Sequence, residues 1–163
     1  MKTLLIVFDS VTGGTRQMAE AAARGAASET GLATRLVLAE EAGPADVLAA
    51  DGYLFATPEM LAALSGRMKS FFDRTYYAAL DRIQGRPYAL LVCAGSDGAN
   101  AVRQVERIAA GWRLKAVAEP IVVCTHAQTP EAIAAPKTIP REALQCCEDL
   151  GAAMAAGLAL GVF

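Results

Sequence analysis

The chain has few of the residues that metal and disulfide sites require. It has one histidine, His126, and its four cysteines (Cys93, Cys124, Cys146 and Cys147) form no C-x-x-C pair. Two of these cysteines lie in apolar runs typical of strands, and the other two lie in a run typical of a helix. We therefore expect free thiols in a reducing cytoplasm rather than a metal or disulfide framework.

An excess of charge of either sign is also absent. Fifteen basic and seventeen acidic residues leave a net charge of −2 on 163 residues, which excludes a basic nucleic-acid surface and an acidic disordered tail. The apolar run Leu4–Phe8 is too short for the core of a signal peptide, and the weakly polar stretch Gly151–Phe163 is too short to span a bilayer. We expect one cytoplasmic domain, residues 1–163, with no nucleic-acid partner and no membrane contact.

Large hydrophobic side chains are fewer than the apolar fraction of 54% suggests, because 35 of the residues counted in it are alanine. The larger hydrophobic residues still suffice for a sizeable core. We expect the alanine-rich helix faces to let helices and sheet approach one another closely.

What the chain does contain is a regular alternation of strands and helices. The expected strands are Thr3–Phe8, Thr34–Leu38, Gly52–Ala56, Tyr88–Ala94 and Ala116–Cys124, and the expected helices are Arg16–Glu29, a short Ala45–Ala50, Ser65–Leu80, Asn100–Trp112 and Arg141–Leu160. Five buried strands that alternate with helices predict one doubly wound α/β domain, a parallel sheet covered by helices on both faces. The irregular stretch Thr125–Pro140 is long enough to be functional or mobile rather than filler.

The loop after the first strand has the composition of a phosphate site. It reads Ser10-Val11-Thr12-Gly13-Gly14-Thr15 and opens the first helix, at the edge where an open α/β sheet binds its ligands. Three hydroxyls, two glycines and the free amides of a helix start can surround an anion, which the helix dipole also favours. The simpler interpretation is a helix cap, but a cap needs one hydroxyl and this loop offers three.

Other phosphate and nucleophile motifs are missing from the chain. There is no G-x-x-x-x-G-K-[ST], no G-x-G-x-x-G after the first strand and no G-x-S-x-G. A receiver domain needs an acidic cluster after the first strand, where Asp9 stands alone, and an aspartyl phosphatase needs an acid at the position of Val11. These absences exclude P-loop nucleotidases, phosphotransfer receivers and α/β-hydrolases, and they weaken a dinucleotide-binding interpretation.

The remaining pattern resembles a known family. Residues Ser10–Thr15 resemble the [ST]-x-T-G-x-T loop with which flavodoxins hold the phosphate of FMN. The blocks Asp51–Pro58 and Leu64–Arg74 resemble the third strand and helix of flavodoxin-like quinone reductases and NAD(P)H-dependent FMN reductases, and Leu91–Gly98 resembles their loop after strand four. The resemblance implies a flavodoxin-like five-stranded parallel sheet of order 2-1-3-4-5, with FMN where the strand order reverses.

The resemblance also implies three groups of flavin contacts. The phosphate would lie on Ser10, Val11, Thr12, Gly13, Gly14 and Thr15; the dimethylbenzene and N5 side of the ring on Thr57, Pro58, Glu59, Met60 and Leu61; and its pyrimidine edge on Ala94, Gly95, Ser96, Asp97 and Gly98. Backbone amides in the third group would face N1, O2 and N3, where donors stabilise reduced flavin. Without the other two groups, Gly95–Gly98 would be interpreted as a surface turn.

The chain departs from carrier flavodoxins at two points. The second and third groups contain no aromatic residue, so Met60 or Leu61 would pack against the ring. The stretch Glu59–Ala63 also lacks the glycine that lets a peptide flip in those relatives, and a non-glycine residue at positive φ costs about 1 kcal/mol or more. We therefore expect the one-electron-reduced flavin to be less stabilised and two-electron hydride chemistry to be favoured.

These observations predict an FMN-dependent oxidoreductase in which NAD(P)H reduces the flavin and the flavin reduces a quinone or similar acceptor. The near-neutral charge agrees, because carrier flavodoxins tend to be strongly acidic around the flavin. The alternatives are a one-electron carrier that docks to redox proteins and a flavodoxin-like module without FMN. No catalytic side chain is assigned; His126 and the 125–140 stretch stay without a role, and a homo-oligomer is expected by analogy alone.

Overall fold

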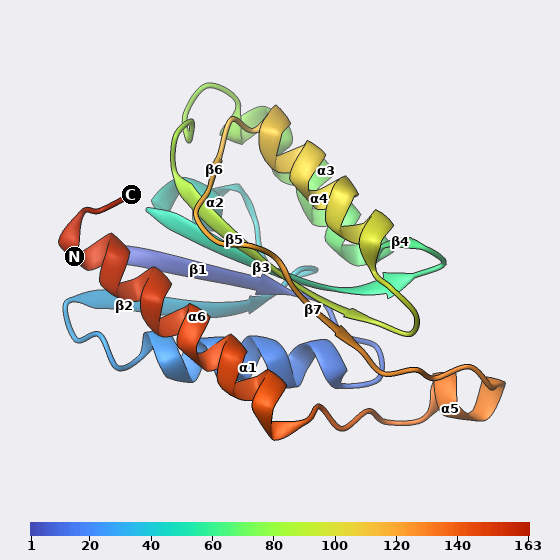
Figure 1. Cartoon of the computed structure of the whole chain (residues 1–163). Coiled ribbons are helices and arrows are strands. Elements are labelled where there is room, and N and C mark those ends of the chain that lie inside the picture. Colours follow the sequence, from blue (N-terminus) through green and yellow to red (C-terminus); the bar gives the residue numbers. More distant parts are fainter.

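The computed structural model describes all residues 1–163 and alternates strands with helices along the chain (Figure 1). The strands are β1 (Lys2–Phe8), β2 (Leu32–Leu38), β3 (Gly52–Met60), β4 (Ala63–Leu64), β5 (Pro87–Ala94), β6 (Lys115–Ala116) and β7 (Ile121–Cys124). The helices are α1 (Gly14–Ala26), α2 (Pro44–Ala49), α3 (Gly66–Ala79), α4 (Ala99–Gly111), α5 (Pro130–Ala134) and α6 (Arg141–Leu160). Helix α6 has the bounds expected from the sequence.

The sheet has the flavodoxin-like topology. Strands pair in the order β2-β1-β3-β5-β6, with β7 paired to β5 beyond β6, and all these pairs are parallel. The predicted order 2-1-3-4-5 is confirmed, but the fifth strand, expected over Ala116–Cys124, is two short strands. The interruption ends at Pro120, which has no N–H to donate to a neighbouring strand.

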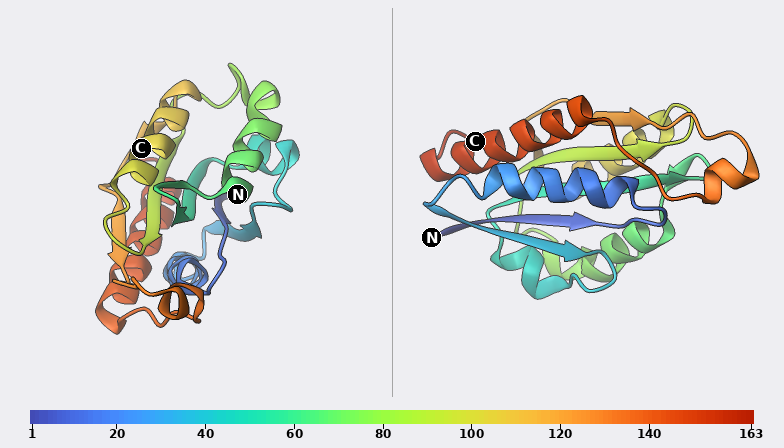
Figure 2. Two further views of the ribbon diagram at one scale, coloured as in Figure 1. Left: turned by 90° about the vertical axis from the view of Figure 1, so that its right-hand side faces the viewer. Right: turned by 90° about the horizontal axis from the view of Figure 1, so that it is seen from below.

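Helices cover both faces of the sheet, as Figure 2 shows from two further directions. Side chains of successive strand residues point to opposite faces. On β1, Leu5 and Val7 pack with residues of α2, α3 and α4, whereas Leu4 and Ile6 pack with residues of α1 and α6. The sheet therefore separates two apolar cores, and both faces of the predicted doubly wound architecture are present.

Helices α1 and α6 pack against each other backbone to backbone. A Cβ atom at Gly25 of α1 would lie 1.8 Å from the carbonyl oxygen of Glu148, and a Cβ at Gly151 of α6 would lie 1.9 Å from that of Ala22. The two helix backbones therefore touch directly, which only glycine allows at these two positions. The close approach of these two helices therefore depends on two reciprocal glycines; the role expected for the alanines stays a prediction.

Helix α6 is long and apolar enough to cross a bilayer by length and composition alone. In this fold it packs on α1 and on the sheet, and Cys147, Met154 and Leu158 are buried there. These contacts are those of a core helix.

Two short elements were not expected from the sequence. Strand β4 pairs antiparallel with the end of β3 and makes a hairpin, and α5 adds one turn of helix inside the stretch expected to be irregular. Both lie beyond the carboxyl ends of the parallel strands, on the right-hand side of Figure 1. They therefore border the edge at which the candidate site was expected.

Candidate functional site

The three candidate segments meet at one edge of the sheet. Residues Ser10–Thr15 follow β1, residues Thr57–Leu61 end β3, and Ala94–Gly98 end β5. Because β1, β3 and β5 are adjacent and parallel, their carboxyl ends lie side by side. The left-hand view in Figure 2 looks along the strands at this edge, with the β3–β4 hairpin on one side and α5 on another.

The first segment, called the phosphate loop from here on, is closed by its own serine. Ser10 Oγ accepts hydrogen bonds from the backbone N–H groups of Gly13 at 3.2 Å and Arg16 at 3.3 Å. Gly13 has φ of 93°, a left-handed conformation that favours glycine. The loop therefore wraps tightly into the first turn of α1, as the Gly-rich motif predicts.

Thr15 holds an unsatisfied polar atom inside this loop. Its side chain is 1% exposed, and its Oγ1 has no hydrogen-bond partner. Leaving a buried hydroxyl unpaired costs about 1–3 kcal/mol, so such a group requires an explanation. One other buried hydroxyl, that of Thr34 on the edge strand β2, is also unpaired, but it lies outside the candidate segments. The phosphate oxygens of FMN are acceptors of the kind Thr15 lacks, so the residues present fit that group.

Gly14 is required by the close approach of other elements to the loop. A Cβ atom at this position would lie 2.6 Å from Cys93 Sγ on β5 and 3.3 Å from Ile139 Cδ1. Burial raises the pKa of the Cys93 thiol, partly offset by the positive charge of Lys137. Cys93 is therefore a neutral thiol packed beneath the loop, consistent with the free cysteines expected from the sequence.

An ion pair joins the end of β1 to the start of α3. The Asp9 side chain is 5% exposed, and its Oδ1 lies 2.9 Å from Nε of Arg67. A buried carboxylate without a partner would place a negative charge at the edge where flavin is expected. Arg67 compensates that charge, and it was not singled out by sequence analysis because its pairing with Asp9 depends on the tertiary fold.

The second segment is a strand and a turn rather than a loop. Thr57 is fully buried; its Oγ1 accepts from the Ser65 N–H at 3.1 Å, and Ser65 in turn caps α3. Its side chain therefore supports the start of α3. Pro58 and Glu59 are half-buried and continue β3, and the Met60 side chain is 42% exposed at its end.

The turn between β3 and β4 consists of Leu61 and Ala62, whose φ angles are 50° and 61°. Met60 pairs with Ala63, so the two residues form a two-residue hairpin turn of type I′, which usually contains Asn or Gly. The left-handed conformation, which the absence of glycine was expected to disfavour, is thus already adopted. Two side chains of α4 hold it: Asn100 Nδ2 donates to the Ala62 carbonyl at 2.6 Å and Gln104 Oε1 accepts from the Leu64 N–H at 2.9 Å.

The third segment is a tight turn that leads into α4. Ala94 and Gly98 are buried, Gly95 is half-buried, and Ser96 and Asp97 are exposed. Gly98 has φ of 68°, and a Cβ atom there would lie 2.9 Å from Val122 Cγ1. Ser96 and Asp97 are therefore accessible to a ligand, as the interpretation of a flavin-binding loop requires.

The stretch expected to be irregular, residues 125–140, is attached to the phosphate loop. The N–H of Lys137 donates to the Thr12 carbonyl at 2.8 Å. Gln17 links the two further: its Nε2 donates to the carbonyls of Gly13 at 3.0 Å and Lys137 at 2.7 Å, and its Oε1 accepts from the Ile139 N–H at 3.1 Å. Sequence reasoning missed Gln17 and Lys137, since contacts 120 residues apart leave no local pattern. His126 is exposed, with φ of 58°, and makes no side-chain contact that suggests a role.

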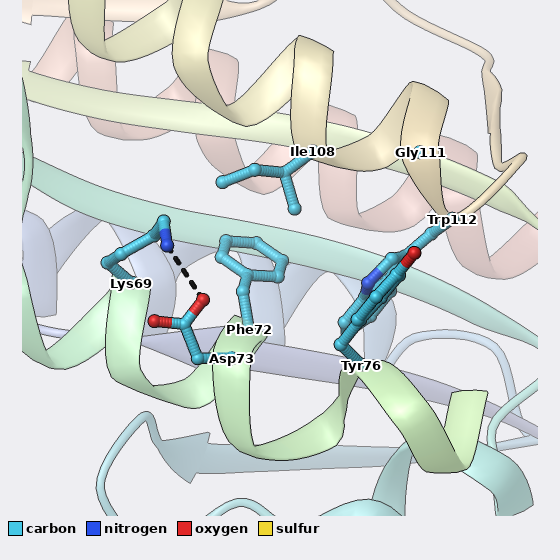
Figure 3. Close-up of a pocket in the computed structure, with 7 residues that line it drawn as sticks. All are labelled: Lys69, Phe72, Asp73, Tyr76, Ile108, Gly111 and Trp112. Carbon is cyan, nitrogen blue, oxygen red and sulfur yellow. Dashed lines mark hydrogen bonds and ion pairs between the residues drawn. The ribbon is translucent and has the colours of Figure 1, made fainter. Parts of the chain in front are cut away.

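A separate pocket of about 240 Å³ lies between α3 and α4 (Figure 3). It is lined by Lys69, Phe72, Asp73, Tyr76, Ile108, Gly111 and Trp112. Phe72 and Trp112 belong to the core, with ring centroids 5.2 Å apart, and Lys69 and Asp73 pair with each other at 2.7 Å. No residue of the three candidate segments lines this pocket, so it is not part of the candidate site.

Parts of the chain are similar in sequence to known proteins. Residues 44–129 match the model of the NADPH-dependent FMN reductase family. A flavodoxin from Aquifex aeolicus is 38% identical over 97 residues, which are 60% of this chain and 50% of the relative. An NAD(P)H dehydrogenase (quinone) from Acidithiobacillus ferrooxidans is 33% identical over 95 residues, covering 46% of this chain and 48% of the relative. The chain thus spans about half the length of the curated relatives it matches.

Solved structures share the fold at low sequence identity. A flavodoxin from the domain Archaea superposes with a TM-score of 0.77 at 18% identity, covering 96% of this chain and 98% of that one. A WrbA-like flavodoxin protein from Agrobacterium tumefaciens gives 0.74 at 21% identity, with 99% of each chain covered. Together with the sequence matches, these likenesses define the chain as a flavodoxin-like protein of the FMN-binding class. Because the family model covers more than half of its residues, it belongs to the NADPH-dependent FMN reductase family.

Proposed function

We propose that this protein is an FMN-dependent oxidoreductase that takes electrons from NAD(P)H and passes them to a quinone or similar small acceptor. The observation that carries the proposal is the buried, unpaired hydroxyl of Thr15 inside a phosphate loop, at the carboxyl edge of a flavodoxin-like sheet. Membership of the NADPH-dependent FMN reductase family supports the same cofactor. When bound, FMN supplies the redox chemistry, since it can accept a hydride from a nicotinamide and deliver electrons onward.

The chain's own residues bind and orient the cofactor. Ser10, Thr12 and Thr15 would hold the phosphate together with the backbone N–H groups that start α1. The exposed Met60 and Leu61 of the β3–β4 hairpin would contact the ring from one side. The backbone of Ala94–Gly98 would donate to the pyrimidine edge, where added electron density is stabilised by fixed dipoles.

The electrostatics of the edge support a reductase. Asp9 is paired with Arg67, which leaves Glu59 and Asp97 as the acidic side chains of the three segments without an ion-pair partner. A weakly charged edge disfavours the anionic reduced flavin less than a strongly acidic one would. It also offers little steering toward a basic partner protein, which a carrier needs for fast association.

A one-electron carrier is the second candidate, and a specific observation favours it. The Aquifex aeolicus relative, 38% identical over its matched region, is a flavodoxin by name. The two candidates differ in their reaction with nicotinamides: a reductase oxidises NADH or NADPH directly, whereas a carrier needs a separate reductase.

Absorption spectroscopy of the purified protein tests the proposal. We expect the bands of oxidised flavin, or their appearance after FMN is added and excess removed by gel filtration. Anaerobic addition of NADH or NADPH should then bleach these bands, and a soluble quinone should restore them. Bound flavin that neither nicotinamide bleaches would support the carrier, and a protein that takes up no FMN would indicate a binding module without cofactor.

A further inference from the structure

We propose that Lys137, a residue outside all three candidate segments, binds the phosphate group of the flavin. This inference rests on the proposed function and deepens it by adding a charged partner to a loop that contains none. The phosphate loop Ser10–Thr15 offers hydroxyls and backbone N–H groups but no cation of its own. A phosphate monoester carries a charge between −1.5 and −2 near neutral pH by analogy with phosphorylated side chains.

Lys137 is fixed against the loop through its backbone. Its N–H donates to the Thr12 carbonyl at 2.8 Å, and its carbonyl accepts from Gln17 Nε2 at 2.7 Å. Its Cβ is 3.4 Å from the point where a Cβ at Gly14 would lie, so its side chain starts in contact with the loop backbone. The position of the side-chain stem is therefore set by contacts that do not involve the ammonium group.

The ammonium group of Lys137 has no anionic partner. None of the six ion pairs in the structure includes it; instead Nζ donates to the carbonyls of Ile133 and Ala135, at the carboxyl end of α5. Its charge reaches Cys93, where it lowers the thiol pKa against the larger effect of burial, and Cys93 lies beside Gly14 of the loop. A lysine with uncompensated charge and a flexible stem can turn from carbonyl acceptors to a phosphate.

Two arginines near the candidate site, Arg16 and Arg67, already have anionic partners. The guanidinium of Arg16 lies 5.1 Å from the centre of the Phe8 ring and 3.9 Å from Glu20. Arg67 pairs with the buried Asp9 at 2.9 Å. Lys137, unlike these two arginines, has no anionic partner in the structure, and a bond from its ammonium to phosphate is of the strong, charge-assisted kind.

Binding of FMN and of riboflavin, which lacks the phosphate, tests this assignment. Flavin fluorescence quenching gives Kd for the wild-type protein and for Lys137→Met, Lys137→Arg and Lys115→Met. Lys115 is an exposed lysine of β6. It pairs with the first residue of β5, at the amino end of that strand and away from the candidate site, so its variant controls for net charge. Lys137→Met keeps both backbone hydrogen bonds, and circular dichroism confirms that each variant is folded.

We expect Lys137→Met to weaken FMN binding by about tenfold or more and to leave riboflavin binding unchanged. Lys137→Arg should retain most of the affinity for FMN, and Lys115→Met all of it. The inference is overturned if Lys137→Met binds FMN like the wild type, or if it weakens FMN and riboflavin equally, as a purely structural residue would. Failure of the wild-type protein to bind FMN would instead overturn the proposed function itself.

Discussion

Arg67 and Asp9 form an ion pair that connects the first turn of α3 to the residue before the phosphate loop, with Nε and Oδ1 2.9 Å apart. The Asp9 side chain is 5% exposed, whereas that of Arg67 is 50% exposed. The carboxylate therefore depends on one half-exposed partner for its charge compensation. Removal of Arg67 alone would leave this buried carboxylate without a partner, whereas removal of Asp9 would leave a half-exposed guanidinium that water can solvate.

Arg67→Met is expected to destabilise the protein, because it leaves a buried carboxylate unpaired. The loss should be about 1–3 kcal/mol, below the range for fully buried pairs since Arg67 is half-exposed. Urea denaturation measures it. The double variant Asp9→Asn/Arg67→Met is the control, and it should recover part of the loss because no charge remains to be compensated. Equal stability of the double variant and Arg67→Met would show that the charge of Asp9 is not the cause.

The β3–β4 hairpin should be more stable with glycine in its turn. Ala62 has φ of 61°, a conformation that costs a residue with a Cβ atom about 1 kcal/mol. We expect Ala62→Gly to raise the free energy of unfolding by about 0.5–1 kcal/mol, because glycine adopts this left-handed conformation without strain. Ala63→Gly, one residue later in β4, should lower it. A destabilised Ala62→Gly variant would contradict the type I′ turn.

The contact between α1 and α6 should not tolerate a methyl group. A Cβ at Gly151 would lie 1.9 Å from the Ala22 carbonyl oxygen, so Gly151→Ala must separate the two helices. We expect a loss of about 1–3 kcal/mol or more, the range for overpacked cores, measured by thermal or urea unfolding. Gly111→Ala, at the exposed end of α4 with nothing near its Cβ position, is the matched control and should be neutral or slightly stabilising. Equal effects of the two substitutions would contradict this packing.

The adjacent cysteines of α6 should differ in reactivity. Cys146 is exposed, whereas burial, with smaller effects of Cys146 and Cys93, raises the pKa of the Cys147 thiol from 9.0 to about 12. Because the thiolate is the reactive form, Cys146 should react with a disulfide reagent at pH 8 in the native protein and Cys147 should react only on unfolding. Mass spectrometry of peptides identifies the labelled thiol, and labelling of native Cys147 at the rate of Cys146 would contradict its burial.

The same pKa shift has a consequence for stability. The folded state holds the Cys147 proton more tightly than the unfolded chain, so this contribution to stability is fully present below about pH 9 and is lost as pH rises toward about 12. The decline in the denaturation midpoint between pH 8 and pH 10.5 should be smaller in Cys147→Ala than in the wild type.

Much of the fold follows from local patterns in the sequence. The continuous apolar run of β1 and the apolar stripe of α3 depend on residues close together in the chain, so these elements and most of the other helices were predicted correctly. The strand order was implied by the resemblance to flavodoxins, and it too is confirmed. The hairpin at Leu61–Ala62 was missed because its turn residues are atypical, and β4 is only two residues long. The division of the fifth strand was missed because Val117 and Ala118 continue the apolar run, although pairing with β5 stops after the hydrogen bond from the Val117 N–H to the Tyr88 carbonyl and resumes only at Ile121.

The candidate site likewise has one part that the sequence predicted and another that depends on the tertiary structure. The phosphate loop is a continuous motif and could be found from its hydroxyls and glycines alone. The pairing of Arg67 with Asp9, the bridge made by Gln17 and the position of Lys137 depend on segments distant in sequence, which only the assembled sheet brings together. The sequence also could not show that the hydroxyl of Thr57, which was interpreted as a flavin contact, accepts a hydrogen bond from the Ser65 N–H at the start of α3.

The central claim, that residues Ser10–Thr15 hold the phosphate of FMN, is tested most directly by titrating FMN into the wild-type protein and into Thr15→Val. Valine has the shape of threonine without the unpaired hydroxyl, so the variant without ligand should be more stable by about 1 kcal/mol. The account predicts saturable binding of one FMN per wild-type chain and at least about tenfold weaker binding by the variant, with riboflavin binding unchanged. No FMN uptake by the wild type, or equal affinity of the two proteins for FMN, would contradict it.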